Sequence, residues 1–224
     1  MNKIIDEARR RGVTRLCHFT KAANLAHIIA TRELRDTALL EASDDSFRPS
    51  DMNRRDGHRG HICLSLEYPN SWYLQEARNR DLSFPDWVVI TLDISILETP
   101  GARFCPHNAA RLLGAGIRDG ATGFNSLFSD RVGDRYRNSV HPPWWPTDDQ
   151  AEILIPGPIS SSFIRSVITQ SDEQAELETF RLKLQFPTED IPPLDVAPVL
   201  FQPRELSWQV RRGNRPIEMK YTHE

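Results

Sequence analysis

The sequence has few cysteines and no long apolar run. Cys17, Cys63 and Cys105 are widely spaced and form no CxxC pair, so reduced thiols in the cytoplasm are the economical interpretation. No segment approaches the roughly 18 apolar residues that a membrane-spanning helix needs. The charged start, MNKIIDEARRRG, has no apolar segment of the kind found in a signal peptide. We therefore expect a cytoplasmic protein that makes no use of a membrane.

Several motifs of common enzyme classes are also missing. There is no phosphate-binding loop of the Walker type, no strand followed by GxGxxG and no GxSxG elbow. His58, His61 and Cys63 lie close together in the sequence, but a zinc site needs a further pair of ligands that is not nearby. Cys17 and His141 can be imagined as a nucleophile pair, yet Cys17 lies in an apolar run typical of the core. We expect no metal.

The composition is that of a folded, soluble protein. Hydrophobic residues make up 39% and charged residues 26% of the 224 residues. A chain of this length can bury a core and suggests one large domain, or one domain with an extension. The formal net charge of −3 gives no sign of a nucleic-acid partner, although it leaves room for a local basic groove.

Hydrophobic periodicity predicts a mixed α+β protein, with central mixed or antiparallel sheets flanked by helices. The expected helices cover residues 3–11, 21–33, 71–81 and 171–185, the third one capped by Asn70. The expected strands cover residues 13–20, 61–68, 87–95, 151–157 and 163–170. Residues 41–60 and 119–149 have loop character. We place one domain at residues 1–185, and a proline-rich extension packed on it at residues 186–224.

A carboxylate stands at the start of one predicted strand, in the stretch TDDQAEILIPGPI. Gln150 precedes Glu152 by two residues, so on an extended strand both side chains would point to the same face. Other candidates are dispersed: His18 and Thr20 on the first strand, and Arg54 in an arginine-rich loop. Each of these alone also fits an ordinary structural histidine, a solvated arginine or a polar strand edge.

Four segments, taken in order, resemble the DarT family of DNA ADP-ribosyltransferase toxins. They are LCHFTKAANLAHII, DMNRRDGHRGHICLSLEYPN, RFCPHNAAR and DDQAEILIPGPI, and the second is similar to the branch with an Arg-x-Asp-Gly … Pro-Asn pattern. The resemblance implies a compact ADP-ribosyltransferase-like fold with NAD⁺ as co-substrate and no metal. It also implies transfer of ADP-ribose to a nucleobase of single-stranded DNA, as the toxin of a toxin–antitoxin or phage-defence system.

The resemblance further implies roles for particular residues. Glu152 would stabilise the positive charge that develops on the ribose, and Arg54 would be catalytic and hold the diphosphate, with Arg55 as the alternative. The expected cofactor-binding residues are His18, Thr20, Asn24, Arg54, Arg55 and Tyr73. The expected substrate-binding residues are Gln150, Trp144, Trp145, His107 and Asn108.

The acceptor side leaves several alternatives open. Trp144 and Trp145 would stack on a base, or else fill the core beneath a long loop; Arg131, Arg135 and Arg137 would supply positive charge. The acceptor would be single-stranded DNA or a flipped base, with RNA or a protein side chain as the second choice. A catalytically idle nucleotide-binding module is the third. The resemblance implies an antitoxin partner with macrodomain ADP-ribosyl-hydrolase activity.

Overall fold

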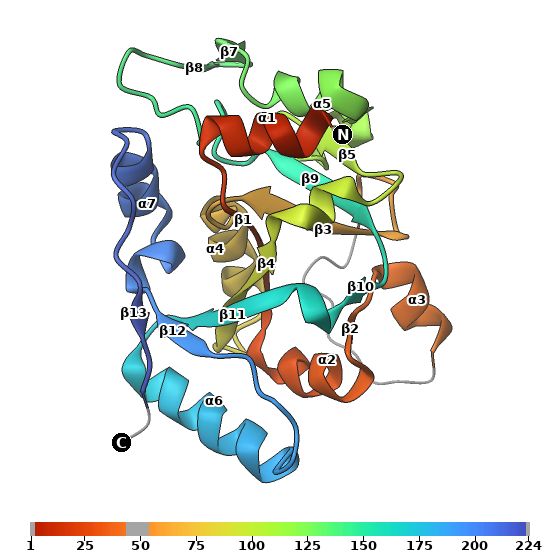
Figure 1. The fold of residues 1–224 in the computed structure, drawn as a ribbon, viewed down its shortest axis with the longest axis vertical. Helices are drawn as coiled ribbons and strands as arrows, with labels where there is room; N and C mark the ends of the chain where they lie inside the picture. The colour runs from red at the N-terminus through yellow and green to blue at the C-terminus, as the bar shows by residue number, and fades with distance from the viewer. Residues whose placement is uncertain (1–2, 44–53, 223–224) are drawn as a thin grey trace.

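The structure is a computed structural model that describes residues 3–43 and 54–222. Its centre is a nine-stranded mixed sheet (Figure 1) in which only the β11–β12 pair is parallel. The strands, in sheet order, are β13 (Met219–Lys220), β12 (Leu194–Val196), β11 (Ile164–Thr169), β4 (Trp87–Asp93), β1 (Arg15–Lys21), β3 (His61–Leu66), β9 (Glu152–Pro156), β5 (Arg103–Cys105) and β6 (Arg118–Asp119). Two small pairs lie beside it: β2 (Glu33–Leu34) with β10 (Ile159–Ser160), and β7 (Arg131–Val132) with β8 (Arg135–Tyr136).

Helices surround this sheet, as expected for an α+β protein. The α-helices are α1 (Lys3–Arg11), α2 (Leu25–Thr31), α3 (Thr37–Ala42), α4 (Ser71–Arg80), α5 (Gly120–Ser126), α6 (Asp172–Gln185) and α7 (Pro203–Val210). The 3-10 turns are η1 (Ala22–Asn24), η2 (Ile94–Glu98), η3 (Arg111–Gly114), η4 (Ser161–Phe163) and η5 (Pro198–Phe201). Figure 1 shows α1 and α5 at one end of the molecule and α6 at the opposite end.

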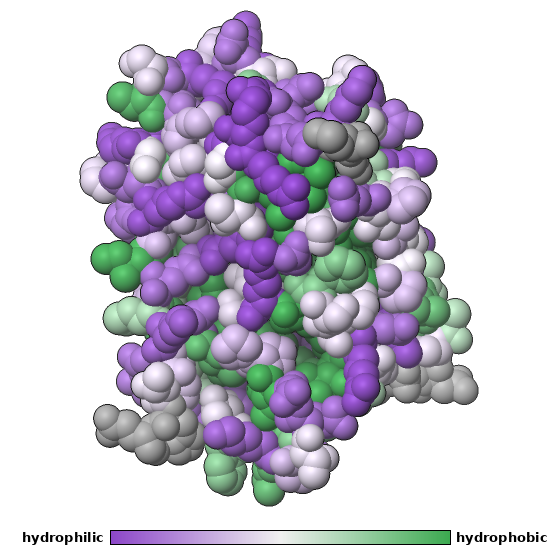
Figure 2. All heavy atoms as spheres, in the orientation of Figure 1, coloured by the Kyte–Doolittle hydropathy of each residue, from purple (hydrophilic) through white to green (hydrophobic). Residues whose placement is uncertain are grey.

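Strand β4, which is rich in β-branched residues, lies at the centre of the hydrophobic core. WVVITLD pairs with β1 on one side and β11 on the other, so both edges of the strand are hydrogen-bonded. Val88 and Ile90 on one face of the strand and Val89 and Thr91 on the other face are buried, as a central strand covered on both faces requires. Figure 2 shows polar side chains over most of the face seen in Figure 1, with apolar ones visible between them near the middle.

Most predicted elements are present, and the differences have local causes. The cap of α4 is confirmed, because the Asn70 Oδ1 atom accepts a hydrogen bond from the Tyr73 amide at 3.1 Å. Helix α5 was not predicted, since its sequence, GATGFNS, contains two glycines and few strong helix formers. Phe124 holds it in place by packing edge-on against Phe104 at 5.5 Å between ring centroids.

The C-terminal segment does more than cover the surface. Strand β12 pairs in parallel with β11, and β13 pairs with β12, so this segment extends the main sheet. Helix α7 lies against α4, and the Ser71 hydroxyl donates a hydrogen bond to the Leu200 carbonyl at 2.5 Å. The domain boundary at residue 185 stays a prediction.

Two features are absent from the described residues, 3–43 and 54–222. None of their helices is both long and apolar enough to cross a bilayer. They also contain no group of three or more His, Cys, Asp or Glu side chains placed to hold a metal ion.

Candidate active site

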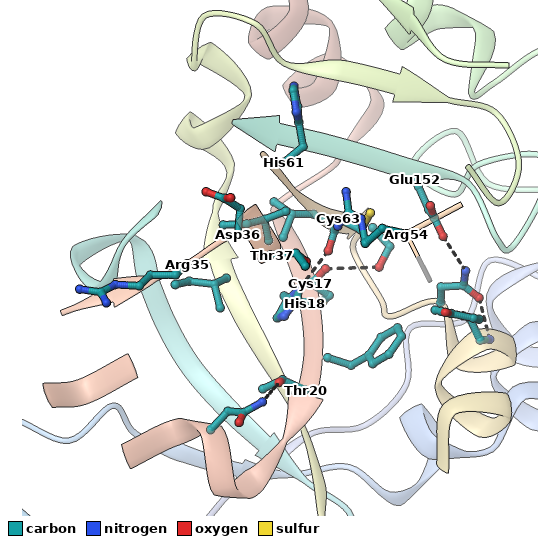
Figure 3. Close-up of a pocket in the computed structure, with 18 of the residues that line it drawn as sticks. Cys17, His18, Thr20, Arg35, Asp36, Thr37, Arg54, His61, Cys63 and Glu152 are labelled. Atoms are coloured by element: carbon teal, nitrogen blue, oxygen red, sulfur yellow. Dashed lines mark hydrogen bonds between the residues drawn. The ribbon is translucent and has the colours of Figure 1, made fainter. Parts of the chain in front are cut away.

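A pocket opens where β1, β3 and β9 meet α2, the β2–α3 connection and the start of α4. Its cavity volume is about 210 Å³. Figure 3 shows Glu152, Arg54 and His18 around this pocket, with Thr20 farther along it. The pocket thus brings together residues separated by more than a hundred positions in the sequence.

Glu152 lies at the first position of β9, between β3 and β5. The apolar residues that follow it on this strand fix the register, with Ile153 opposite Leu64 on one side and Phe104 on the other. Because both neighbours are hydrogen-bonded to β9, the backbone that carries the carboxylate is held on two sides. A rigid strand can place a catalytic side chain more accurately than a loop can.

Neutral donors surround the Glu152 carboxylate. Its Oε1 accepts hydrogen bonds from the side-chain amides of Asn108, at 3.1 Å, and Asn70, at 3.3 Å. Its Oε2 accepts one from the backbone amide of Ala109 at 3.0 Å. Two parts of the chain, the start of α4 and the segment after β5, therefore orient one carboxylate.

Burial dominates the electrostatics of this carboxylate. The loss of solvent around Glu152 raises its pKa from 4.5 to about 7, and the nearby Asp56 adds to the rise. The Ala109 and Asn70 hydrogen bonds and the Arg54 charge act in the opposite direction. A carboxyl group with a pKa near neutrality is suited to exchange a proton during a reaction.

Arg54 lines the pocket, whereas Arg55 is exposed and lies outside it. The Arg54 guanidinium is buried and forms an ion pair with Asp56 at 3.1 Å, and it also hydrogen-bonds to the His58 carbonyl. Its φ of +37° is rare for a residue with a side chain. Such backbone outliers cluster at functional sites, so the geometry favours Arg54 over Arg55.

Strand β1, which β3 separates from β9 in the sheet, also lines the pocket. The His18 Nδ1 atom lies 2.9 Å from the Cys63 carbonyl, and burial lowers the pKa of His18 below its usual value, so its ring is neutral at neutral pH. The Asn24 side chain donates a hydrogen bond to the Thr20 hydroxyl at 2.9 Å. Tyr73 lines the pocket and packs edge-on against Phe19, 6.0 Å between centroids.

His107 and Asn108 are adjacent in the sequence, but only Asn108 lines the pocket. Asn108 lines the pocket and contacts Glu152, so the structure places it on the carboxylate. His107 is not among the lining residues; its Nδ1 atom lies 2.9 Å from the Asn108 carbonyl. Gly116 packs against the same ring so closely that a Cβ atom there would lie 2.5 Å from His107 Nε2.

The prediction that Trp144 and Trp145 form a stacking platform is wrong. Both are in the hydrophobic core, with 8% and 2% of their surface exposed. The Trp145 indole donates to Asp149 at 2.9 Å, and the Arg215 guanidinium lies over the Trp144 ring at 4.4 Å. The loop has little regular secondary structure, so these two large buried side chains attach it to the hydrophobic core. This agrees with the alternative that they fill the core beneath a long loop.

Gln150 does not lie on β9, so the argument that it shares a strand face with Glu152 is wrong. The strand begins at Glu152, and residues 148–151 form a turn closed by the Ala151 amide and the Asp148 carbonyl at 3.0 Å. Gln150 is partly exposed and does not line the pocket. Its expected contact with the acceptor stays a prediction.

The three arginines of residues 131–137 differ in their exposure. Arg131 and Arg135 are exposed. Arg137 is partly buried and donates hydrogen bonds to the carbonyls of Trp145, at 2.8 Å, and Pro142, at 2.7 Å. It therefore supports the long loop from within.

A nucleophile pair of Cys17 and His141 does not fit the structure. Burial raises the pKa of Cys17 to about 12, so its thiol stays protonated. Its sulfur lies 3.2 Å from the Glu67 carbonyl, whereas His141 Nε2 lies against the carbonyls of Trp145 and Pro146. Each group has its own partners.

Sequence reasoning missed several polar residues of the pocket, among them Asn70, Asp56 and Asp36. Asn70 was predicted only as a helix cap, but its amide also reaches Glu152. Asp56 stands inside the Arg-x-Asp-Gly segment and pairs with Arg54. Asp36 caps α3 by accepting from the Leu39 amide at 3.0 Å, and Gly157 packs against its carboxylate where a Cβ atom would collide. The Pro-Asn and Arg-x-Asp-Gly patterns were the available signals for the first two.

Comparisons with known proteins identify the family of the chain. The family model described as "ssDNA thymidine ADP-ribosyltransferase, DarT" matches residues 17–198, which is more than half of the chain. No curated protein matches the chain.

Solved structures share the fold at low sequence identity. Thermus sp. 2.9 DarT in complex with NAD⁺ is 12% identical, with a TM-score of 0.59 over 84% of this chain and 97% of that one. The same protein in complex with ADP-ribosylated ssDNA is 13% identical, with a TM-score of 0.60 over 85% and 97%. Thermosipho africanus DarTG in complex with ADP-ribose is 15% identical, with a TM-score of 0.61 over 84% of this chain and 51% of that one. The chain belongs to the DarT family of single-stranded DNA thymidine ADP-ribosyltransferases.

Proposed function

We propose that the chain transfers ADP-ribose from NAD⁺ to the base of a thymidine in single-stranded DNA, with Glu152 as the catalytic carboxylate. The observation that carries this proposal is the position of Glu152: a strand-borne carboxylate in the pocket wall, held by two asparagine amides and one backbone amide. The family description gives the acceptor and the reaction.

The pocket has the groups that NAD⁺ requires. Arg54 offers a planar guanidinium for the diphosphate, which suits two-point binding of phosphate better than a lysine does. Neutral His18, with Thr20 and Asn24 beside it, provides hydrogen-bonding groups along β1 for a ribose or the nicotinamide amide. Tyr73 adds an aromatic face. NAD⁺ complexes of Thermus sp. 2.9 DarT, which has the same fold, support this assignment.

The reaction breaks the bond between the ribose C1′ atom and the nicotinamide nitrogen. Positive charge builds on the ribose as nicotinamide leaves, as in other glycosyl transfers. The ionised Glu152 carboxylate stabilises that charge. A ring nitrogen of the base then forms the new bond to C1′, and Glu152 takes up the proton that this nitrogen loses.

The acceptor must enter as an unpaired base. Glu152 is 7% exposed and lies in a recess, so a base stacked inside a duplex cannot approach it. An unstacked or single-stranded nucleotide avoids this obstacle. His107 and Gln150 remain proposed acceptor contacts, now as residues outside the pocket wall.

We also propose that the chain is a toxin opposed by an antitoxin that removes ADP-ribose, a macrodomain hydrolase. This chain matches only 51% of Thermosipho africanus DarTG, so that protein carries further sequence beside the shared fold. Co-expression with a macrodomain hydrolase is expected to restore the growth that the chain alone suppresses. Growth suppression by a Glu152→Gln variant would instead show a toxicity unrelated to transfer.

The experiment incubates the protein with NAD⁺ labelled in its ADP-ribose part and with four separate acceptors: a thymidine-containing DNA strand, its duplex, the equivalent RNA and cell protein. We expect label on the single strand only. An oligonucleotide with every thymidine replaced by cytidine serves as the matched control. Label on RNA or protein alone would favour the second acceptor class, and the absence of both transfer and NAD⁺ binding would favour an idle module.

A further inference from the structure

Two exposed leucines stand next to the Glu152 site, in the turn η3. We call residues Arg111–Gly114 the leucine tip. The side chains of Leu112 and Leu113 are 72% and 78% exposed. The tip follows Ala109, whose amide binds Glu152, and Ala110, which lines the pocket. Water therefore surrounds two large apolar side chains within a few residues of the catalytic carboxylate.

The backbone of the leucine tip is unusual. Leu112 and Leu113 have φ values of +54° and +52°, and among the described non-glycine residues no other two neighbours both have positive φ. Glycine or asparagine adopts this conformation more easily than leucine does. A turn that needed only this backbone shape would be expected to contain glycine or asparagine. The two leucines at these positions therefore indicate that their apolar side chains have a function.

The tip is anchored at both ends to the active site. On one side Ala109 holds Glu152. On the other, Gly114 packs against the backbone of Asp56, the ion-pair partner of Arg54, so closely that a Cβ atom would lie 2.6 Å from the Asp56 carbonyl oxygen. The leucines are thus presented between the segments that carry the catalytic carboxylate and the buried arginine.

Positive charge flanks the leucines. The Arg111 side chain is 58% exposed, and its guanidinium lies 4.0 Å from Asp148. Arg118 is exposed as well, and its guanidinium donates to the carbonyls of Ala115 at 2.7 Å and Ile117 at 2.8 Å. Apolar side chains against bases, with arginines against phosphates, are the combination that binds single-stranded DNA.

We propose that Leu112 and Leu113 contact the bases that flank the target thymidine and keep it unstacked, while Arg111 holds an adjoining phosphate. This rests on the proposed function and adds the place where the DNA strand is gripped outside the catalytic pocket. Apolar side chains inserted beside bases act in this way in other nucleic-acid-binding proteins.

The test is a double variant, Leu112→Asn with Leu113→Asn. Asparagine tolerates the left-handed backbone, so the turn is expected to keep its shape. Leu184→Asn is the matched control, because Leu184 is also 72% exposed but lies on α6, at the other end of the molecule (Figure 1). We measure the KM for a thymidine-containing oligonucleotide, the rate of NAD⁺ hydrolysis without DNA, and the melting temperature.

We expect the double variant to raise the oligonucleotide KM about tenfold or more, the size of one lost base contact. NAD⁺ hydrolysis and melting temperature should match those of the wild type, and the control variant should change nothing. Arg111→Gln should weaken oligonucleotide binding and reduce its salt dependence by about one phosphate contact.

Other results would overturn the proposal. An unchanged oligonucleotide KM rules out base contacts, and a parallel fall in NAD⁺ hydrolysis shows that the leucines only support Glu152. If the double variant instead abolishes a dimer seen by light scattering while the KM stays the same, the tip is a self-association surface. A wild type that labels no DNA refutes the proposed function; fluorescence anisotropy with the same oligonucleotide then still tests whether the leucines bind DNA.

Discussion

Two buried glutamates lie at the same end of the β3–β9 pair, and their partners differ in kind. Glu152, at the start of β9, is held by neutral amides of Asn70, Asn108 and Ala109. Glu67 follows β3 and is 1% exposed; it forms an ion pair with Arg215 at 2.6 Å and hydrogen bonds with the Thr14 hydroxyl, at 3.2 Å, and the Thr14 amide.

Under the proposed mechanism, this difference separates a reactive carboxylate, Glu152, from a structural one, Glu67. A direct positive partner compensates the charge of Glu67 and ties the C-terminal segment to the start of β1. Amide donors orient Glu152 without supplying a full opposite charge, so burial still dominates and raises the pKa of Glu152 to about 7. Buried charges without such a partner mark functional sites more often than structural ones.

The largest expected effect comes from removing each charge in turn. Glu152→Gln should lower the rate of ADP-ribose transfer about 1000-fold, because the developing ribose charge loses its stabiliser. Glu67→Gln, the matched change outside the pocket, should leave the transfer rate within about twofold at a temperature where the variant is folded. Both rates are measured with labelled NAD⁺ and a thymidine oligonucleotide. Equal losses of transfer rate in the two variants would contradict the assignment of Glu152 as reactive and Glu67 as structural.

The two neighbouring arginines offer a second contrast. Arg54→Lys should raise the KM for NAD⁺ about tenfold, because a lysine cannot bind the diphosphate at two points. Arg55→Lys should have no effect, since Arg55 is exposed and outside the pocket. The KM is obtained from NAD⁺ titrations at saturating oligonucleotide. A larger effect at Arg55 would assign the diphosphate to that residue instead.

Stability should show the reverse order of the two glutamates. Glu67→Gln is expected to lower the free energy of unfolding by about 2 kcal/mol, the contribution of a hydrogen bond to a charged group. Glu152→Gln should lower the free energy of unfolding by less, because the glutamine is neutral and the variant avoids the cost of burying an ionised carboxylate. Urea denaturation of both variants at the same pH measures this. A more destabilised Glu152 variant would make that carboxylate structural.

The pH dependence of stability gives a smaller effect with a definite sign. The folded pKa of Glu152, about 7, is above its ordinary value of 4.5, so the folded state binds the proton more tightly than the unfolded state. The resulting stability is present below pH 4.5 and is lost as the pH rises through about 7. The wild type should therefore lose stability relative to Glu152→Gln over this range in paired denaturation curves. If the stabilities of the wild type and the variant change with pH in parallel, the pKa of Glu152 is not shifted by folding.

How far the sequence predicted this site depends on the kind of element. Glu152 and His18 stand on strands whose apolar residues fix the register, so the local pattern placed them on strands, while the roles expected of them came from the resemblance to the DarT family. Trp144, Trp145 and Gln150 lie in or beside an irregular segment. There the alternation of strand faces does not apply, and the choice between core and surface depends on distant partners such as Arg215. Asn70 shows a further limit, because a helix cap is visible in the sequence but its contact with a carboxylate 82 positions away is not.

The pH profile of single-turnover transfer tests the central claim most directly, at saturating NAD⁺ and oligonucleotide. If the ionised Glu152 carboxylate carries the reaction, the rate should rise with pH, with a midpoint near 7, and then level off. Asn108→Asp, which replaces a donor to Glu152 with a second carboxylate, should move that midpoint to higher pH. A midpoint near 4.5, or the same midpoint in wild type and variant, would contradict the account of Glu152 as a carboxylate tuned by burial and amide donors.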